Sequence, residues 1–284
     1  MATARHSAAA HPHPATAAIT FVADLGAHRP DSAGKSDGDR DVPYLPTDQH
    51  VVNKMLEMAK VTKGDYLFDL GCGDGRIVIT AAKLGARALG IDIDLERLRE
   101  CHHNLRNTEL KSLIEFRRQS FFDIDLRPAT VVALYLLPAI NRRLRPKLLW
   151  ELRPGTRIIA NQFEIADWLP DEKIDFKHRP VMLWIVPAWV EGNYRCFFQT
   201  PAGRFHGQLT LRRQFQFLRG ELRIARKIYP LTGRVRGTHV RLDLPPGLPH
   251  HLPRKLTAQA TPRHLTSGVA EHPERSIIWA AIRQ

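Results

Sequence analysis

Apolar and polar positions follow two alternating patterns from about residue 41 onward. Short apolar runs, typical of buried strands, alternate with stretches whose apolar positions repeat at helical spacing. The runs predict strands over 66–70, 86–91, 114–118, 130–136 and 157–162, and the stretches between them predict helices over 76–84, 95–107 and 141–152. Another helix should begin near residue 48, where Thr47 or Asp48 can cap it. Strands that alternate with helices specify an α/β fold with a doubly wound, Rossmann-like parallel sheet.

The pattern changes near Val181. The segment "VMLWIVPAWVEGNYRCFFQ" contains two strand-like runs with Pro187 and Gly192 as breaks. Residues 203–244 then alternate between apolar and polar positions, and glycines at 207, 220, 233 and 237 punctuate the alternation. This pattern predicts a small antiparallel β extension, a meander of several short strands.

The two ends of the chain show no period long enough to bury a face. We therefore predict a disordered tail over residues 1–40, an α/β domain over 41–190, the β extension over 191–245 and a mostly disordered tail over 246–284.

The chain is strongly basic, with a formal net charge of +13 and a pI near 10.1. The predicted meander holds about ten Arg and Lys against two acids, so its outer face should be basic. Such a balance suits acidic partners or nucleic acid. The arginines are spread along the chain, however, so a solvated arginine-rich surface is favoured over specific nucleic-acid binding. Aromatic residues that could stack on bases are few, and alternation turns most of them toward a core: Phe205, Phe215, Phe217 and Tyr229.

Compartment signals are weak. No apolar run approaches the roughly 20 residues that span a membrane, and the N-terminus lacks the pattern of a secretory signal. The three cysteines, Cys72, Cys101 and Cys196, show neither metal spacing nor a disulfide framework. We expect a cytoplasmic protein with reduced thiols and no membrane span.

The stretch "DYLFDLGCGDGRIVITAAK", residues 65–83, places three glycines between a strand and a helix. In an open parallel sheet such a turn lies where ligands bind. Its glycine spacing is one residue tighter than the dinucleotide fingerprint. Asp69 precedes the first glycine and Asp74 lies within the loop, and two carboxylates would repel a phosphate. The turn therefore favours a cationic ligand.

S-adenosyl-L-methionine fits this description, because it carries a sulfonium and an ammonium but no phosphate. Asp69 can receive the ammonium, and Gly71 and Gly73 let the backbone approach the ligand closely. Asp92 closes the next strand, "ALGIDID", where a carboxylate can take both ribose hydroxyls. The neighbouring residues Cys72 and Ile93 complete the predicted cofactor site. The alternative is that the two acids only cap turns.

The third strand should end beside the adenine. In "FRRQSFFDIDL" the adenine amino group could be met by Gln119, Ser120 or Asp123. Phe121 could pack on the adenine face, or it could be a core aromatic like Phe122.

The fourth strand ends in "VVALYLLPAIN", which would line the methyl-acceptor site. The Asn/Asp-Pro-Pro-aromatic motif of many enzymes that methylate planar amines is absent. Tyr135 to Pro138 are apolar apart from one hydroxyl, which suits the aliphatic stem of a lysine and lowers an amine pKa by desolvation. Tyr135 could orient the amine or could be a core residue.

Four segments together resemble a family of seven-strand protein-lysine methyltransferases, which includes a broad-specificity archaeal enzyme and the mitochondrial enzyme that methylates the ATP synthase c-subunit. They are "VPYLPT", "DLGCGDGRIVITAAK", "SFFDIDL" and "LLPAINRRLRPKLLWELRPGTRIIANQFEIADW". The resemblance covers about residues 41–190. It implies that Tyr44, Pro46 and Thr47 close over cofactor and acceptor, and that Asp69, Gly71, Gly73 and Asp92 hold the cofactor. It leaves the basic meander unexplained.

The leading hypothesis is an S-adenosylmethionine-dependent methyltransferase that modifies protein lysine, with Tyr135 and Tyr44 as candidate catalytic residues. A second hypothesis is RNA or small-molecule methylation, in which the basic β extension recruits an anionic substrate. A non-catalytic binding module would predict damage to the glycine loop or to the acidic strand end, and both are intact.

Overall fold

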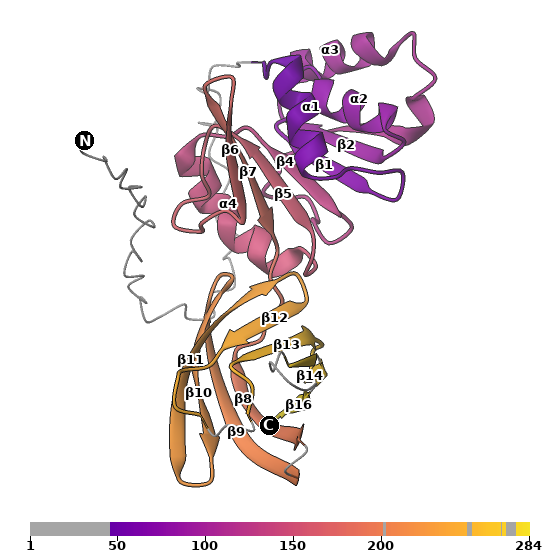
Figure 1. The fold of residues 1–284 in the computed structure, drawn as a ribbon. Helices are drawn as coiled ribbons and strands as arrows, with labels where there is room; N and C mark the ends of the chain where they lie inside the picture. Colours follow the sequence, from indigo (N-terminus) through magenta and orange to yellow (C-terminus); the bar gives the residue numbers. More distant parts are fainter. Residues whose placement is uncertain (1–45, 201–202, 249–251, 268, 271–276) are drawn as a thin grey trace, which may run out of the picture. The chain divides into compact units, whose positions relative to one another are not determined.

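The computed structural model describes residues 46–200, 203–248, 252–267, 269–270 and 277–284. Its first sheet has seven strands (Figure 1): β1 Tyr66–Leu70, β2 Arg87–Asp92, β3 Ile114–Arg118, β4 Val131–Leu134, β5 Arg157–Asn161, β6 Glu172–Phe176 and β7 Arg179–Ile185. Their order across the sheet is β3-β2-β1-β4-β5-β7-β6, and only the pairings of β7, with β5 and with β6, are antiparallel. The order reverses between β1 and β4, so the turn after β1 lies where ligands of such sheets bind.

Helices cover both faces of this sheet: α1 Gln49–Met58, α2 Arg76–Lys83, α3 Leu95–Leu105 and α4 Pro138–Glu151. The first three pack on one face, where their apolar residues meet alternate residues of the strands, such as Leu67 and Ala133. The fourth packs on the other face against Phe68 and Val132. Because the strands are buried on both faces, they read as continuous apolar runs.

The predicted α/β architecture is confirmed, and the element boundaries differ by a few residues. Asp48, rather than Thr47, caps α1, since its Oδ1 accepts a hydrogen bond of 2.8 Å from the His50 amide. The helix predicted from residue 141 begins earlier, because Pro138 occupies its first turn, where proline's fixed φ suits a helix and its missing N–H removes no bond.

The second sheet is a closed barrel. Its strands are β8 Gly192–Thr200, β9 Gly203–Gln214, β10 Phe217–Ile224, β11 Lys227–Arg236, β12 His239–Asp243, β13 Lys255–Ala260, β14 His264–Ser267, β15 Val269–Ala270 and β16 Ile277–Arg283. Each strand from β8 to β14 pairs antiparallel with the next, and β16 pairs with both β8 and β14. This last pairing closes the ring and protects the sheet edges. Figure 1 shows the strands from β8 to β16 curving around one another.

The barrel corrects the prediction that residues 246–284 are mostly disordered, because β13, β14 and β16 lie in that range. Their alternation is hard to detect: β13 turns alanines inward beside Leu256, and β16 is apolar on both faces, with Ile278 exposed and Trp279 buried.

Three of the glycines predicted as breaks lie inside strands of the barrel: Gly207, Gly220 and Gly233. A Cβ at Gly220 would come within 2.0 Å of the Thr210 carbonyl oxygen, so this glycine permits close strand approach.

Barrel and seven-strand sheet contact each other through a few residues. Phe215 joins the core on the α4 face and stacks on Trp168, with ring centroids 6.0 Å apart. The Gln216 side chain donates a 2.7 Å hydrogen bond to the Leu169 carbonyl. Within the described residues, no helix is long and apolar enough to cross a membrane.

Candidate functional site

The turn after β1 is built from residues that adopt positive φ. Gly71 and Gly73 have φ values of 82° and 53°, which side chains rarely tolerate. The amides of Gly71 and Cys72 both donate to the Ile91 carbonyl, at 2.9 and 3.0 Å. These bonds join the turn to the end of β2 and bring Asp69 and Asp92 to the same edge of the sheet.

Asp69 is a buried carboxylate, and no cation pairs with it among the described residues. Its side chain is 2% exposed, and Oδ2 has no hydrogen-bond partner within the described part of the chain. Burial, followed by repulsion from Asp92 and Asp74, raises the pKa of Asp69 well above its ordinary value. A cation placed beside Asp69 would relieve both penalties, whereas a phosphate would increase them. The site therefore fits a cationic ligand.

Asp92 fixes the turn with both of its oxygens. Oδ2 accepts a hydrogen bond of 3.1 Å from the Gly73 amide, and Oδ1 accepts one of 2.9 Å from the Asp94 amide. The bond to Gly73 links the glycine turn to the acidic strand end, two features that the sequence presents as separate motifs. The remaining acceptor capacity of the carboxylate is available to ligand hydroxyls.

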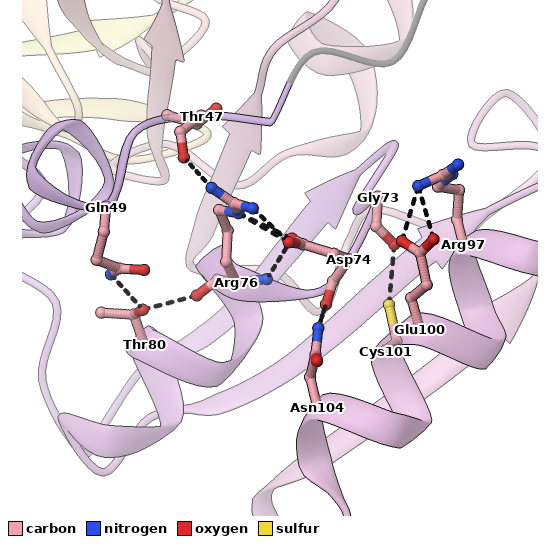
Figure 2. A network of polar contacts seen from close by, with 10 residues as sticks. All are labelled: Thr47, Gln49, Gly73, Asp74, Arg76, Thr80, Arg97, Glu100, Cys101 and Asn104. Carbon is pink, nitrogen blue, oxygen red and sulfur yellow. Dashed lines mark hydrogen bonds and ion pairs between the residues drawn. The ribbon is translucent and has the colours of Figure 1, made fainter.

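Asp74 has a cationic partner of its own in addition to its effect on Asp69. It forms an ion pair with Arg76, whose Nε lies 2.9 Å from Oδ1, so its charge is partly offset (Figure 2). Arg76 also donates to the Thr47 carbonyl at 2.6 Å, and Gln49 donates to Thr80 at 3.0 Å. These contacts attach the segment that precedes α1 to the glycine turn. Thr47 thus lies beside the predicted cofactor turn, while Tyr44 falls outside the described residues.

The third-strand candidates lie in the turn that follows β3. The Gln119 amide donates to the Asp92 carbonyl at 3.1 Å, which places this turn beside the end of β2. Ser120 Oγ accepts from the Phe122 amide at 3.2 Å. Phe121 and Phe122 are partly buried and pack against the core on the α4 face, so both contribute to that core. Ile93, at 44% exposure, leaves a large apolar side chain uncovered next to Asp92.

Cys72 contributes its backbone rather than its thiol. Its side chain is buried, with Sγ 3.9 Å from Cys101 Sγ, and Cys101 donates to the Gly73 carbonyl at 3.0 Å. The hydrogen bond with Cys101 and burial raise the pKa of the Cys72 thiol. Both side chains support the turn, and the Cys72 thiol is a poor nucleophile.

Tyr135 follows β4 at the same edge of the sheet. Its hydroxyl donates to Gln162 Oε1 at 3.1 Å and accepts from Arg179 Nη1 at 3.3 Å. Its ring stacks on Phe163, with centroids 6.2 Å apart. Gln162 holds a strained φ of 70°, a feature often found at functional sites. Tyr135 is thus a polar group held in position by neighbouring strands and is not a core residue.

Asn161, at the end of β5, was not predicted as a site residue. Ala133 pairs with both Asp69 and Ile159, so Asn161 lies on the same face of the sheet as Asp69 and Tyr135. It is 0% exposed, yet neither polar atom of its amide has a partner within the described residues. A buried amide without partners is costly unless a ligand satisfies it. The available signal was an asparagine ending a strand that is otherwise apolar.

Known proteins with the same features are methyltransferases. Residues 69–172 match the model of the ANTKMT methyltransferase domain. A protein-lysine N-methyltransferase of Saccharolobus islandicus is 47% identical over 135 residues, covering 47% of this chain and 84% of the relative. The lysine N-methyltransferase of the ATP synthase c-subunit from Rattus norvegicus is 28% identical over 46% of this chain, which spans 60% of the length of that enzyme. A solved RNA methyltransferase from Salinibacter ruber, in complex with S-adenosyl-L-homocysteine, is 43% identical with a TM-score of 0.50, covering 51% of this chain and 96% of that one.

The seven-strand sheet and its acidic glycine turn define a class I, S-adenosylmethionine-dependent methyltransferase. Within that class, the chain belongs to the protein-lysine methyltransferase family to which the archaeal relative belongs. Each of these relatives matches about half of this chain or less.

Proposed function

We propose that this protein transfers a methyl group from S-adenosyl-L-methionine to the side-chain amine of a protein lysine. The observation that carries the proposal is the unpaired, buried carboxylate of Asp69 at the ligand-binding edge of the sheet. The family of the chain supports lysine as the acceptor. Its archaeal relative is named for lysine methylation without a particular target protein, so the target of this chain is left open.

The cofactor would be held by Asp69 and Asp92, with Gly71 and Gly73 offering close backbone approach and Ser120, Phe121 and Ile93 lying around the next strand ends. When bound, S-adenosylmethionine supplies an electrophilic methyl group. The segment that contains Thr47, fixed to the turn by Arg76, would exclude water from this edge.

The acceptor end suits a neutral amine. Leu136 and Leu137 follow Tyr135 in the chain and Phe163 stacks on its ring, so the strand ends carry apolar surface. Desolvation by such a surface lowers the pKa of an ammonium. The guanidinium of Arg179, 3.3 Å from the Tyr135 hydroxyl, acts in the same direction, because a nearby cation disfavours a second one. Tyr135 and Asn161 then offer oxygen atoms that can accept hydrogen bonds from the amine and orient it. Methyl transfer requires such alignment more than a strong base.

Labelling with tritiated S-adenosylmethionine in a cell extract tests the proposal. We expect label in protease-sensitive bands that mass spectrometry assigns to lysine. Asn161→Ala should lower kcat/KM for the identified protein about 100-fold or more while leaving cofactor affinity, measured by calorimetry, within about twofold. Label on another residue type, or unchanged kinetics in the variant, would contradict the proposal.

RNA methylation is the second candidate function, because the Salinibacter ruber structure carries the name of an RNA methyltransferase. The same labelling experiment separates the two, since label in RNA is lost to ribonuclease and resists protease. The predicted cytoplasmic location is likewise a proposal, which cell fractionation would test.

A further inference from the structure

Positive charge is concentrated in the barrel. Residues 192–284 contain 16 Lys and Arg against four Asp and Glu, whereas residues 1–191 contain 26 against 25. Nearly all of the net charge of +13 therefore belongs to the last third of the chain. A field of this kind attracts polyanions, and the methyltransferase sheet does not share it.

One basic surface of the barrel is already neutralised by the protein itself. A hollow of about 410 Å³ is lined by Arg234, Arg236 and Arg241. Arg234 pairs with Asp171 at 2.7 Å, Arg236 pairs with Glu172, and Arg241 pairs with Asp243 at 3.2 Å. These arginines serve internal contacts, so this hollow is a poor candidate for an anionic ligand.

A second surface is basic and lacks acids. Strands β16, β8 and β9 are adjacent, and none of them contains an Asp or a Glu. Arg195 and Arg204 point outward, are exposed and form no ion pair within the described residues. Because nothing in these strands offsets the two guanidinium groups, both are available to an anion.

An aromatic ring lies between these arginines. Phe197 occupies the middle of the outer face of β8, directly opposite His206 on β9 and Ala280 on β16. Its ring meets the His206 ring edge-on at 5.1 Å, and a hollow of about 280 Å³ opens beside Phe197 and Arg195. Two residues before Phe197 stands Arg195, and Arg204 is paired with Gln199 two residues after it. The outer face thus presents a π-surface with one cation before it on β8 and a second cation diagonal to it on β9.

We propose that this outer face of β16, β8 and β9 binds single-stranded RNA. Arginines that flank a partly exposed ring match the phosphates on either side of a base that stacks on it. A single strand is favoured over a duplex, because a duplex hides its base faces. The side chain of Gln208, exposed next to Arg195 in the register, can both donate and accept a hydrogen bond, which suits the 2′-hydroxyl of RNA.

This site is separate from the methyl-transfer site and does not depend on the function proposed above. Its strands belong to the barrel, whereas Asp69 and Asp92 belong to β1 and β2. RNA bound there would be a docking partner that locates the chain, whichever acceptor its seven-strand sheet methylates.

The test is fluorescence anisotropy of a labelled single-stranded RNA of about 20 uridines, titrated with the full chain without cofactor. We expect binding whose logarithmic affinity falls linearly with the logarithm of salt concentration. Phe197→Leu keeps an apolar side chain but removes the ring, and it should weaken binding about tenfold or more. Phe197→Trp keeps an aromatic ring at this position, so it should bind the RNA about as tightly as the wild type.

Charge variants separate a specific surface from general attraction. Arg195→Gln should weaken binding and reduce the salt slope by about 0.7, the value for one phosphate of a single strand. Arg241→Gln also removes one positive charge, but from the surface whose arginines already pair with acids. It should leave the RNA affinity and the salt slope unchanged. Thermal unfolding of each variant checks that the barrel is intact.

Four results would overturn the proposal: no binding of the RNA at about 100 mM salt, equal loss in Arg195→Gln and Arg241→Gln, wild-type affinity in Phe197→Leu, or equal affinity for duplex RNA or single-stranded DNA. Tight binding of poly-glutamate in place of the RNA would assign the surface to an acidic protein instead. The Asp92→Ala variant should bind the RNA normally, so failure of the methyltransferase proposal would leave this result unaffected.

Discussion

At the scale of single residues, the site depends on groups that the described side chains and backbone leave unsatisfied. Asp69 Oδ2 and both polar atoms of Asn161 are buried without partners among the described residues. By contrast, the exposed acid Asp125 is hydrogen-bonded by Arg127, which lowers its pKa to about 2. Unsatisfied groups cost stability, and the three atoms of Asp69 and Asn161 lie at the edge of the sheet where a ligand with complementary charge would bind.

Asp69→Asn should therefore stabilise the ligand-free protein and impair cofactor binding. The pKa of Asp69 is raised in the folded state above the ordinary value of 3.8, so its protonated form stabilises the fold at low pH and this contribution is lost as pH rises through the raised pKa. At neutral pH the variant should unfold at a higher temperature than the wild type, and its free energy of unfolding should be about 1–3 kcal/mol larger. This difference in stability should fade toward pH 4. Calorimetry should show affinity for S-adenosylmethionine reduced tenfold or more.

Asp125→Asn is the matched control for this prediction. Because the pKa of Asp125 is lowered, its contribution is present at neutral pH and is lost as pH falls through its folded value of about 2. The control should leave cofactor affinity unchanged and should give no gain in stability. Equal stability of Asp69→Asn and the wild type across this pH range would show that Asp69 is compensated in the folded protein.

At the scale of elements, the ends of adjacent strands place these residues together. Gly90 in β2 pairs with Asp69 in β1, and a Cβ at Gly90 would come within 2.6 Å of Phe116 and 3.0 Å of Cys72 Sγ. This glycine therefore allows the aromatic ring and the glycine turn to approach the strand closely. The cofactor turn rests on this contact as well as on its own glycines.

Gly90→Ala should displace Phe116 and the Cys72 side chain. We expect a loss of about 1–3 kcal/mol in the free energy of unfolding, as for other overpacked cores, together with weaker cofactor binding. Gly64→Ala is the control, because the nearest atom to its Cβ would be 3.9 Å away, and its effect should stay within about 0.5 kcal/mol. Chemical denaturation of both variants measures the difference, and similar stabilities would refute the steric argument.

How far the sequence predicts an element depends on the range of the contacts that define it. Strand β1 and the turn after it follow from local signals: an apolar run, three glycines and a following amphipathic helix. The ion pair of Asp74 with Arg76 is local as well, whereas the hydrogen bond from Arg76 to Thr47 becomes visible only when α1 lies beside α2. Asn161 has one local signal, an asparagine at the end of an apolar strand, but its complete burial depends on the neighbouring strands β4 and β7.

The barrel shows this limit most clearly. Its first strands alternate strictly and were predicted as a meander, whereas β16 is apolar on both faces and closes the ring through pairing with β8 and β14. Closure is a long-range property, so no short window of sequence indicates it. The outward position of Phe197, by contrast, follows from local alternation, because Tyr194, Cys196 and Phe198 form the buried face of β8.

At the scale of the whole molecule, two sheets with separate cores share few contacts. The barrel core contains residues from Ala188 onward, and the seven-strand sheet has two cores of its own, to which the barrel segment adds Phe215. The ion pair between Arg234 and Asp171 also joins the two sheets. This arrangement suits a catalytic unit joined to a binding unit.

A chain that ends after Val190 should consequently fold and bind S-adenosylmethionine with nearly the wild-type affinity. It loses the Phe215 ring that stacks on Trp168, so we expect a cost of about 3–5 kcal/mol in the free energy of unfolding, typical of removing a buried phenylalanine. Phe215→Ala in the full chain removes the same contact and should show a similar loss. A truncated protein that fails to fold beside a folded Phe215→Ala variant would make the barrel part of the catalytic core. A folded truncation that keeps cofactor affinity but loses RNA binding would assign the two activities to the two sheets.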